Sequence, residues 1–418
     1  MSIIDLYDLF IHNPQITTDS RNCPKGSIFF ALKGDKFDGN QYAGKALASG
    51  CVYAVIDNPD YYIGERTILV DNVLKTLQQL AHHHRKVLGL PIIGITGTNG
   101  KTTTKELLAA VLSTKFNLLY TEGNFNNHIG VPLTLLRLTH DHEMAVIEMG
   151  ASHPGDIKEL VDIVHPNYGI ITNVGRAHLE GFGSFEGVIR TKGELYDYIR
   201  RSKGKIFIKK ENEYLQSIAK GIEQITYGNG DDAFASGQVV SCDPFLVFNW
   251  KQQGKLHTVE THMIGSYNLD NVLAAVAVGR PAERISRAIA AYEPTNNRSQ
   301  FKKTDNNELI IDAYNANPSS MKVALDNFIT MPVQPKAIIL GDMRELGPTS
   351  DELHAEVVEQ IKKGQFDKVF LCGEHFSKVG KEFSPFATTE AMVEELRKQP
   401  LKGYHILIKG SHSMGLEK

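Results

Sequence analysis

Short apolar runs alternate with amphipathic stretches along most of the chain. In the middle of the sequence, apolar runs at Ile92–Thr96, Met144–Glu148 and Tyr168–Asn173 are separated by segments with the apolar spacing of helices. Each run has the length of a strand, and its continuous apolar character is typical of a strand that is buried on both faces. The alternation predicts a mostly parallel sheet with crossover helices.

Two further α/β regions flank this central one. The first contains three short apolar runs and ends in an amphipathic stretch that predicts a helix. These segments are Ser27–Leu32, Val52–Ile56, Thr67–Val70 and the helix Val73–Leu88. The last region predicts a small doubly wound fold, with strands that each lead into a turn and helices that follow them. The strands are Leu309–Asp312, Ala337–Gly341, Val369–Gly373 and Ile406–Gly410, and the helices cover about 319–330, 350–363 and 389–398.

Residues 203–265 have a different pattern. Lys205–Ile208, Phe245–Trp250 and Leu256–Ile264 predict short antiparallel strands, which we expect to form a β-rich flank of the central domain. A chain of 418 residues exceeds what one hydrophobic core usually holds. The sequence therefore predicts three α/β domains, at residues 1–88, 89–296 and 297–418.

Composition and charge exclude several classes of function. With 42% hydrophobic residues, 22% charged residues and a net charge of −3, the chain gives no reason to expect a nucleic-acid or membrane partner. The four cysteines are far apart and form no Cys-x-x-Cys pair, which favours a reducing compartment. The N-terminus lacks a signal-peptide pattern, and no apolar run is long enough to span a bilayer. We expect a cytoplasmic protein, acting as a monomer.

The most informative segment is Gly94–Thr104, which reads Gly-Ile-Thr-Gly-Thr-Asn-Gly-Lys-Thr-Thr-Thr between a predicted strand and a predicted helix. Strand, glycine loop, Lys-Thr and helix together are typical of a phosphate-binding loop. Gly97 and Gly100 allow backbone N–H groups to approach phosphate oxygens. The Lys101 ammonium can reach the outer phosphates, and the Thr102 hydroxyl can ligate Mg²⁺. The alternative is an ordinary glycine-rich turn, because the usual pattern has glycine where this chain has Ile95.

Three residues follow later strands of the central region and could serve the same site. Glu148 ends a strand, where its carboxylate could hold Mg²⁺ or remain a surface acid. His178 follows the next strand, as a metal ligand or a loop histidine. Lys192 lies 14 residues further along, and its spacing alone does not distinguish it from a solvated helical lysine.

Polar turns supply further candidates. The segment 123–132 holds three asparagines and two glycines, which could bind a polar ligand or cap a helix. Asn268 and Asn271 stand before a predicted helix at Val272–Val278, where either could cap the helix and one could face an adenine. Arg298 could stabilise a phosphoryl group or be a linker charge, and Asp312 ends a strand, where a carboxylate can bind ribose hydroxyls.

Two patterns favour purely structural interpretations. His82-His83-His84 cannot share one metal site, because consecutive helical positions point in different directions, and we expect an exposed helical face there. Thr349-Ser350-Asp351-Glu352 predicts a capping box. In the first region, Thr18-Asp19-Ser20-Arg21 and the turn Lys33–Gly39 indicate by themselves little more than a strand and its turns.

Taken together and in this order, these motifs resemble the Mur ligase family of peptidoglycan synthesis over nearly the whole chain. The Thr-Gly-Thr-Asn-Gly-Lys-Thr-Thr loop is shared across that family and with folylpolyglutamate synthases. Other segments resemble the branch that adds D-alanyl-D-alanine. They are Lys105-Glu106, Gly123–Asn127, Ile147–Gly150, Asn173-Val174-Gly175, Ala177–Glu180, Tyr314–Pro318, Gly341-Asp342-Met343, Glu345-Leu346-Gly347 and Lys409-Gly410-Ser411. One position departs from the pattern: His412 stands where family members often have arginine.

The resemblance implies an ATP- and Mg²⁺-dependent ligase that joins D-alanyl-D-alanine to UDP-N-acetylmuramoyl-tripeptide through an acyl phosphate. It implies a uridine-nucleotide domain, a central ATP-binding domain and a Rossmann-like domain. The implied nucleotide-binding residues are Gly97, Thr98, Asn99, Gly100, Lys101, Thr102, Thr103, Asn271, Arg298 and Asp312. Thr102, Glu148, His178 and, if it is carbamylated, Lys192 would serve the metal ions, and Lys101, Lys192, His178 and Glu148 would be catalytic. The implied substrate-binding residues are Ser20, Arg21, Lys33, Asp38, Gly39, Asn126, Asn127, Tyr314, Asn315 and Asn317.

Two other classes stay open at this point. One is an amide ligase of the same type with another acceptor, such as the enzyme that adds the third amino acid or a folylpolyglutamate synthase. The other is a P-loop ATPase or regulatory switch that ligates nothing. A nucleic-acid-binding NTPase has little support, because no basic stripe with interleaved aromatic residues is present.

Overall fold

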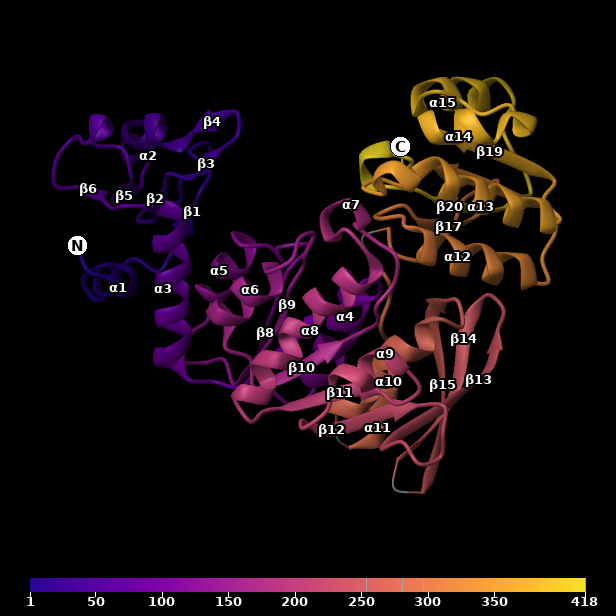
Figure 1. Cartoon of the computed structure of the whole chain (residues 1–418), viewed down its shortest axis with the longest axis horizontal. Helices are drawn as coiled ribbons and strands as arrows, with labels where there is room; N and C mark the ends of the chain where they lie inside the picture. The colour runs from indigo at the N-terminus through magenta and orange to yellow at the C-terminus, as the bar shows by residue number, and fades with distance from the viewer. Residues whose placement is uncertain (253, 280, 296, 418) are drawn as a thin grey trace. The chain divides into compact units, whose positions relative to one another are not determined.

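The computed structural model describes residues 1–252, 254–279, 281–295 and 297–417. They fold into two compact units (Figure 1). The first unit comprises residues 1–95, 116–150 and 156–168, and the second comprises 96–115, 151–155 and the described residues from 169 onward. The ends of the predicted domains at 296 and 418 lie outside the described residues. No helix in the described ranges combines the length and apolar character needed to cross a membrane.

The N-terminal part of the first unit is built on a four-stranded parallel sheet in the order β1-β2-β5-β6. A short β3–β4 hairpin stands beside it. The predicted apolar runs and the predicted helix are confirmed here. The elements are α1 (Ile3–His12), β1 (Ile16–Thr17), β2 (Ile28–Phe30), β3 (Lys33–Gly34), β4 (Phe37–Asp38), α2 (Ala43–Ala48), β5 (Tyr53–Ile56), β6 (Thr67–Leu69) and α3 (Val73–Leu88), with 3₁₀ turns at Gly39–Tyr42 and Pro59–Tyr61.

Helix α3 corrects the expectation of an exposed histidine face. Its N-cap is Asn72, and Gly89 ends it in a left-handed conformation. His84 is buried, because its ring lies between the Tyr7 hydroxyl of α1 at 3.2 Å and the carbonyl of Leu138 at 2.9 Å. His82 and His83 are half-buried. The face of α3 that carries His84 is therefore packed within the first unit, whereas Lys75, Gln79 and Lys86 are exposed.

The rest of the first unit holds three parallel strands in the order β7-β9-β8. The predicted strands at 92–96 and 144–148 are confirmed as β7 and β9. The elements are β7 (Ile92–Thr96), β8 (Leu118–Tyr120), α5 (Gly130–Leu135), β9 (Met144–Glu148) and α6 (Asp156–Val164).

The second unit contains strands in the order β10-β11-β12-β13-β14-β15, and one prediction is wrong there. β11 pairs with β12 in parallel, not antiparallel, because helix α9 connects the two strands as a crossover. Only β13, β14 and β15 form the expected antiparallel meander. The elements are α4 (Lys101–Leu112), β10 (Tyr168–Ile171), α7 (Leu179–Phe182), α8 (Phe185–Arg201), β11 (Lys205–Lys209), α9 (Glu213–Ile218), β12 (Glu223–Gly228), β13 (Ala235–Cys242), β14 (Phe245–Gln252), β15 (Lys255–Ile264), α10 (Asn268–Val278) and α11 (Ala282–Ala290).

A five-stranded sheet in the order β16-β17-β20-β18-β19 completes the second unit. All its neighbouring strands are parallel except β16, which runs antiparallel to β17. The elements are β16 (Gln300–Lys303), β17 (Glu308–Asp312), α12 (Pro318–Thr330), β18 (Lys336–Gly341), α13 (Ser350–Lys363), β19 (Lys368–Cys372), α14 (Glu374–Val379), α15 (Thr389–Lys398) and β20 (His405–Lys409), with 3₁₀ turns at Gly347–Thr349, Lys381–Phe383 and His412–Met414.

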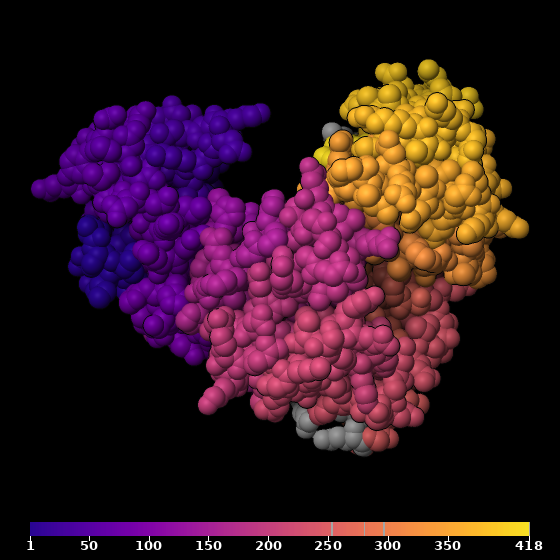
Figure 2. Space-filling model, viewed as in Figure 1, coloured from indigo at the N-terminus to yellow at the C-terminus, as the bar shows by residue number. Residues whose placement is uncertain are grey.

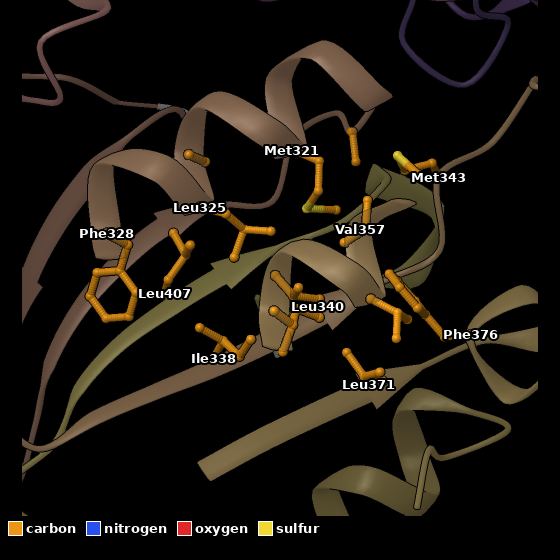
Figure 3. Packing of buried hydrophobic residues seen from close by; sticks show 14 of the residues in the cluster. Met321, Leu325, Phe328, Ile338, Leu340, Met343, Val357, Leu371, Phe376 and Leu407 are labelled. Carbon is orange, nitrogen blue, oxygen red and sulfur yellow. The ribbon is translucent and has the colours of Figure 1, made fainter. Parts of the chain in front are cut away.

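One face of this sheet carries a dense apolar core (Figure 3). Side chains of α12, α13 and α14 pack onto residues of β18, β19 and β20, and the Met343 side chain from the loop after β18 joins them. The labelled members are Met321, Leu325, Phe328, Ile338, Leu340, Met343, Val357, Leu371, Phe376 and Leu407. This packing fixes the strand ends from which the loops of the sheet emerge.

Two predicted helix caps are wrong. Thr349 precedes α13, but residues 347–349 already form a 3₁₀ turn, so its backbone is not extended and its hydroxyl donates to the Leu346 carbonyl at 3.0 Å instead. Asn268 and Asn271 do not cap α10, because that helix starts at Asn268 after Tyr267. Both asparagines are buried inside the helix, so their amides serve other contacts.

Candidate active site

The glycine loop lies between β7 and α4, and its two glycines are required by geometry. Gly97 has φ of 141° and Gly100 has φ of 76°, conformations that disfavour side chains. A Cβ atom on Gly97 would lie 2.0 Å from the Thr172 hydroxyl oxygen, and one on Gly100 would lie 2.4 Å from the Asn271 amide oxygen. Helix α4 begins directly after Gly100, so the loop leads into a helix N-terminus with its backbone N–H groups.

Residues after β10 hold this loop in place. The backbone N–H groups of Thr98 and Asn99 donate to the Asn173 carbonyl and side-chain oxygen, each at 3.0 Å. In return, the Thr172 hydroxyl donates to the Asn99 carbonyl at 2.7 Å. The predicted motif that starts at Asn173 is thus a brace for the glycine loop.

The first turn of α4 presents the predicted phosphate-binding side chains. The Lys101 ammonium donates to the Gly97 carbonyl at 2.9 Å and the Thr98 carbonyl at 3.1 Å. Thr102 is buried and Thr103 is half-buried. The lysine side chain therefore folds back over the carbonyl groups of its own loop.

Asn271 is brought to the same loop. Its side-chain oxygen accepts a hydrogen bond from the Thr104 hydroxyl at 3.0 Å, and its nitrogen donates to the Asn268 side chain at 2.8 Å. The asparagine is buried between α10 and α4. Its hydrogen bond with Thr104 connects α10 to α4.

Lys192 lies in the interior of the second unit, whereas His178 is half-buried. Lys192 is only 2% exposed, so the solvated alternative is wrong; its ammonium contacts the Ala151 carbonyl at 3.4 Å and lies 5.4 Å from the centre of the Phe182 ring. Burial lowers the pKa of His178, the Glu345 carboxylate opposes that shift, and the positive charges of Lys101 and Lys192 add to it. The three predicted residues therefore share one electrostatic environment.

Glu345 is the partner that sequence reasoning missed. Its carboxylate pairs with Nδ1 of His178, which stands just before α7 with φ of 50°. The two residues are 167 positions apart. The motif Glu345-Leu346-Gly347 was visible in the sequence, but nothing local indicated which residue it contacts.

The end of β17 and the segment after it carry further predicted residues, one of which contacts the glycine loop. Asn317 caps α12 by accepting from the Ser320 N–H at 2.9 Å, and its amide exchanges hydrogen bonds with the Asn99 amide at 2.7 and 3.4 Å. Asp312 accepts from the buried Lys409 ammonium at 2.5 Å, and that ammonium also donates to the Asn315 carbonyl at 3.2 Å. The predicted substrate residues Asn315 and Asn317 and the predicted ribose residue Asp312 therefore all make hydrogen bonds within the protein.

Arg298, Tyr314 and His412 form a stacked group. The Arg298 guanidinium carbon lies 3.7 Å from the centre of the Tyr314 ring, and the His412 ring stacks on the same tyrosine with centres 5.6 Å apart. Among the described residues, the buried Nε of Arg298 has no hydrogen-bond partner. A buried guanidinium donor of this kind suits an anionic ligand.

The other predicted residues lie in the first unit. Glu148 is 1% exposed, and one carboxylate oxygen accepts from the Asn126 amide at 2.8 Å. The Asn127 side-chain oxygen accepts from the backbone N–H groups of Ile129 and Gly130 just before α5, although the N-cap of that helix is Ile129. Asn126 is thus the asparagine of this turn that contacts a predicted metal residue.

Of the N-terminal candidates, Arg21 and Lys33 are exposed and pair with nearby carboxylates, and Asp38 is half-buried. The Arg21 guanidinium binds the Asp19 carboxylate in a bidentate manner, and the hydrogen bonds to Arg21 lower the pKa of Asp19 to about 2. The Lys33 ammonium lies 2.8 Å from the Asp57 carboxylate. Asp38 accepts from the Asn40 backbone N–H at 3.0 Å.

Two residues of the same turns remain. A Cβ on Gly39 would lie 2.3 Å from the Leu32 carbonyl oxygen, so only glycine fits there. Ser20 is half-buried in the preceding turn. No group of three or more histidine, cysteine, aspartate or glutamate side chains that could hold a metal ion exists within the described residues.

Comparisons with known proteins decide the family. Three family models match the chain in succession: the Mur ligase family catalytic domain at residues 12–85, the Mur ligase middle domain at 95–279 and the Mur ligase glutamate ligase domain at 297–412. The chain is 34% identical to the UDP-N-acetylmuramoyl-tripeptide–D-alanyl-D-alanine ligase of Bacillus subtilis, over 96% of this chain and 91% of that protein. The chain belongs to the Mur ligase family.

Solved structures of Mur ligases agree with the three-domain α/β architecture. A MurF from Acinetobacter baumannii aligns with a TM-score of 0.87 at 29% identity, over 96% of this chain and 91% of that one. MurF ligase from Thermotoga maritima, solved in complex with ADP, also aligns with a TM-score of 0.87, at 25% identity over 98% of this chain and 96% of that one. The resemblance inferred from the motifs is confirmed.

Proposed function

We propose that this Mur ligase joins D-alanyl-D-alanine to UDP-N-acetylmuramoyl-tripeptide with conversion of ATP to ADP and phosphate, in the synthesis of a peptidoglycan precursor. The observation that carries the proposal is the alignment over nearly the full length with ligases of that name. The glycine loop braced by Thr172 and Asn173 supplies the nucleotide site that the reaction needs.

The reaction must activate a carboxylate, whose direct substitution would expel oxide. Transfer of the terminal phosphoryl group of ATP to the tripeptide carboxylate gives an acyl phosphate, and the amine of D-alanyl-D-alanine then attacks its carbonyl carbon and expels phosphate. The first step brings two anions together, so positive charge is required there. We assign that charge to Lys101, which lies over the carbonyls of its own loop.

ATP is the cofactor we assign to the loop residues Gly97, Thr98, Asn99, Gly100, Lys101, Thr102 and Thr103. The ADP in the Thermotoga maritima structure supports nucleotide binding by this architecture. Arg298 is assigned to phosphate because its buried Nε has no partner among the described residues. Asn271 and Asp312 are assigned to adenine and ribose, and their present contacts with Thr104 and Lys409 would hold them in orientation.

Mg²⁺ would neutralise phosphate charge in this site when it is bound. The chemistry of two predicted ligands suits that ion: the Thr102 hydroxyl, buried at the start of α4 in the second unit, and the Glu148 carboxylate, buried at the end of β9 in the first unit, both offer oxygen. His178 is assigned to the same function, with its Nδ1 held by Glu345. Each of these residues is proposed as a ligand, directly or through water.

Lys192 is proposed to be carbamylated. Its ammonium is buried, and both Lys101 and His178 belong to the same electrostatic environment. Carbamylation would replace a positive charge among like charges by a carboxylate-like group that can ligate a metal ion. We expect Lys192→Ala to be nearly inactive and partly rescued by short carboxylic acids, measured as ligation rate, with exposed Lys220→Ala as the control. Full activity of Lys192→Ala without added acid would remove the assignment.

The remaining assignments concern substrate and location. Ser20, Arg21, Lys33, Asp38 and Gly39 would bind the uridine nucleotide, with Asn126, Asn127, Tyr314, Asn315 and Asn317 on the peptide side. The domains would end near residues 88 and 296. A cytoplasmic location is supported by the four cysteines, all of which are free thiols.

The deciding experiment is a coupled assay of phosphate release with ATP, UDP-muramyl-tripeptide and one acceptor at a time. We expect release to depend on D-alanyl-D-alanine, with an amide product of the corresponding mass. meso-Diaminopimelate, lysine and glutamate are the comparison acceptors, and preference for one of them would assign the chain to another ligase branch. ATP turnover that needs no acceptor would favour the ATPase or switch class instead.

A further inference from the structure

The loop after β18 belongs to the motifs noted in the sequence, and it enters the proposed function only through the contact of Glu345 with His178. We call Asp342–Leu346 the β18 loop. It leaves the end of a central strand of the last sheet and returns to the 3₁₀ turn before α13. The contacts of Asp342, Met343, His354 and Glu345, from the base of the loop to its tip, indicate that the loop positions one side chain.

The base of the loop is fixed by a buried carboxylate. Asp342 is 1% exposed, and its two oxygens accept from the backbone N–H groups of His375 at 2.9 Å and Phe376 at 3.0 Å. A Cβ on Gly373 would lie 2.3 Å from the Asp342 carboxyl carbon, so the surroundings are closely fitted to this side chain. The next residue, Met343, inserts its side chain into the apolar core (Figure 3).

A fully buried histidine holds the next peptide group. Nε2 of His354 in α13 accepts from the Met343 N–H at 3.0 Å, and Nδ1 contacts the Ser350 carbonyl at 2.6 Å. Because a carbonyl oxygen only accepts, the proton is on Nδ1 and the lone pair is on Nε2. His354 is therefore a neutral anchor with one defined tautomer.

The tip of the loop is strained and contacts the candidate active site. Glu345 has φ of 61°, a left-handed conformation that costs free energy in a residue with a side chain. Its carboxylate pairs with Nδ1 of His178, and its carbonyl accepts from the Glu180 N–H at 3.5 Å. Figure 2 shows the magenta surface around α7 against the orange surface of this part of the second unit.

We propose that Glu345 is a positioning residue for His178, and that His354 is the buried anchor that keeps Glu345 in place. A carboxylate at Nδ1 fixes the proton on that nitrogen and leaves the lone pair on Nε2, the form that can ligate a metal ion. The inference rests on the proposed role of His178 in the reaction. The strain at residue 345 is then the cost of presenting this carboxylate.

The first test separates function from stability at Glu345. Glu345→Gln is expected to lower the ligation kcat by about 10- to 100-fold, as is usual when the partner of a metal-ligating histidine is lost. Glu345→Gly should lose as much activity but unfold at the same or a higher temperature, because glycine accepts the left-handed backbone. Exposed Glu352→Gln is the control and should match the wild type in both measurements. Full activity of Glu345→Gln would overturn the proposal.

The second test asks whether His354 acts through Glu345. The side-chain amide of His354→Gln can take the place of Nε2 and still accept from the Met343 N–H. The shorter amide of His354→Asn can take the place only of Nδ1, which contacts the Ser350 carbonyl. The glutamine variant should therefore retain more activity. In a double-mutant cycle on kcat, the double variant Glu345→Gln/His354→Asn should lose little more activity in total than Glu345→Gln alone. Independent, multiplying losses would overturn the anchor role.

The third test does not depend on catalysis. ¹⁵N NMR of histidine-labelled full-length protein, with the His178 signal identified by its loss in His178→Gln, should report a proton on Nδ1. In Glu345→Gln the signal should shift towards a mixture of tautomers, and an unchanged signal would overturn the positioning role. If His178→Gln ligates at the wild-type rate while the tautomer still depends on Glu345, the catalytic assignment of His178 fails, and the positioning of Glu345 loses its purpose.

Discussion

Two loops of the second unit, one after β7 and one after β18, are stabilised in opposite ways. The glycine loop at residues 97–100 has two positive φ angles, both at glycines, and is held from outside by Thr172 and Asn173. The β18 loop has its positive φ at Glu345, a residue with a charged side chain, and is held from below by the buried Asp342 and His354. The glycine loop presents backbone N–H groups, whereas the β18 loop presents the carboxylate of Glu345.

The difference shows what each loop is suited to recognise. Backbone N–H groups can approach a phosphate only where no side chain intervenes, so glycine is needed and the strain is small. A loop that must deliver one side chain cannot use glycine at that position, and it needs buried hydrogen bonds to hold the strained backbone. Four predictions test this contrast, from the largest expected effect to the smallest.

The largest effect is expected at the start of α4. Lys101→Met should lower the ligation rate by at least about 100-fold, roughly 3 kcal/mol of barrier, because the charge facing the phosphates is lost. Its melting temperature should stay close to that of the wild type, since the ammonium is only half-buried. Lys220→Met serves as the matched control. An undiminished rate in Lys101→Met would show that the glycine loop does not act on phosphate.

The next largest effect is expected at the base of the β18 loop. Asp342→Ala should destabilise the second unit by about 3 kcal/mol, because two buried N–H groups lose a charged acceptor. Asp351→Ala is the control: its carboxylate, 51% exposed, also contacts His375 and should cost at most about 1 kcal/mol. Urea denaturation measures both. Equal losses of unfolding free energy in the two variants would contradict the role of Asp342 as the buried anchor of the β18 loop.

A smaller effect should separate space from conformation in the glycine loop. Gly97→Ala adds a methyl group that would meet the Thr172 hydroxyl, whereas Gly155→Ala at φ of 91° meets nothing within 4 Å. We expect the second change to cost about 1 kcal/mol and the first about 1–3 kcal/mol more, with weaker ATP binding only in the first. Thermal unfolding and nucleotide titration are the measurements. If the two variants have the same stability and the same ATP affinity, Thr172 can move to make room for the added methyl group.

The smallest effect concerns pH. Burial lowers the pKa of His354, and the hydrogen bond to the Ser350 carbonyl opposes this shift without cancelling it. The unfolded chain, with a histidine pKa of about 6.5, therefore takes up the proton first as the pH falls. Stability should decline below about pH 6.5, at up to about 1.4 kcal/mol per pH unit for this group, and His354→Gln should decline less steeply. Melting temperatures between about pH 7.5 and 5.5 test this, and parallel curves would contradict it.

Most strands of the fold could be predicted from the sequence, because a buried parallel strand is a short, continuous apolar run. β12, β13 and β16 were not predicted, since much of each is exposed and polar. The direction of β11 was predicted wrongly because the helix that makes it a crossover, α9, is only six residues long. The start of α10 was misplaced because asparagines at a helix start resemble caps even when they are buried inside it.

The candidate site divides in the same way. The glycine loop was predictable because its requirements lie within a few consecutive residues. The contact of Glu345 with His178 was not, because it joins segments 167 positions apart and depends on a strained backbone. The burial of Lys192 also depends on tertiary packing, so its spacing in the sequence could not distinguish it from other helical lysines.

The bonds that Arg85 makes in the first unit bear on how the chain can be divided. Its guanidinium donates from α3 to the carbonyls of Val164 and His165 and to the side chain of Asn167, across about 80 positions of sequence. A fragment that stopped near residue 88 would expose this arginine and deprive His84 of the Leu138 carbonyl. Expression of the N-terminal region by itself therefore requires either that the segment from Leu138 to Asn167 is retained or that both side chains are replaced.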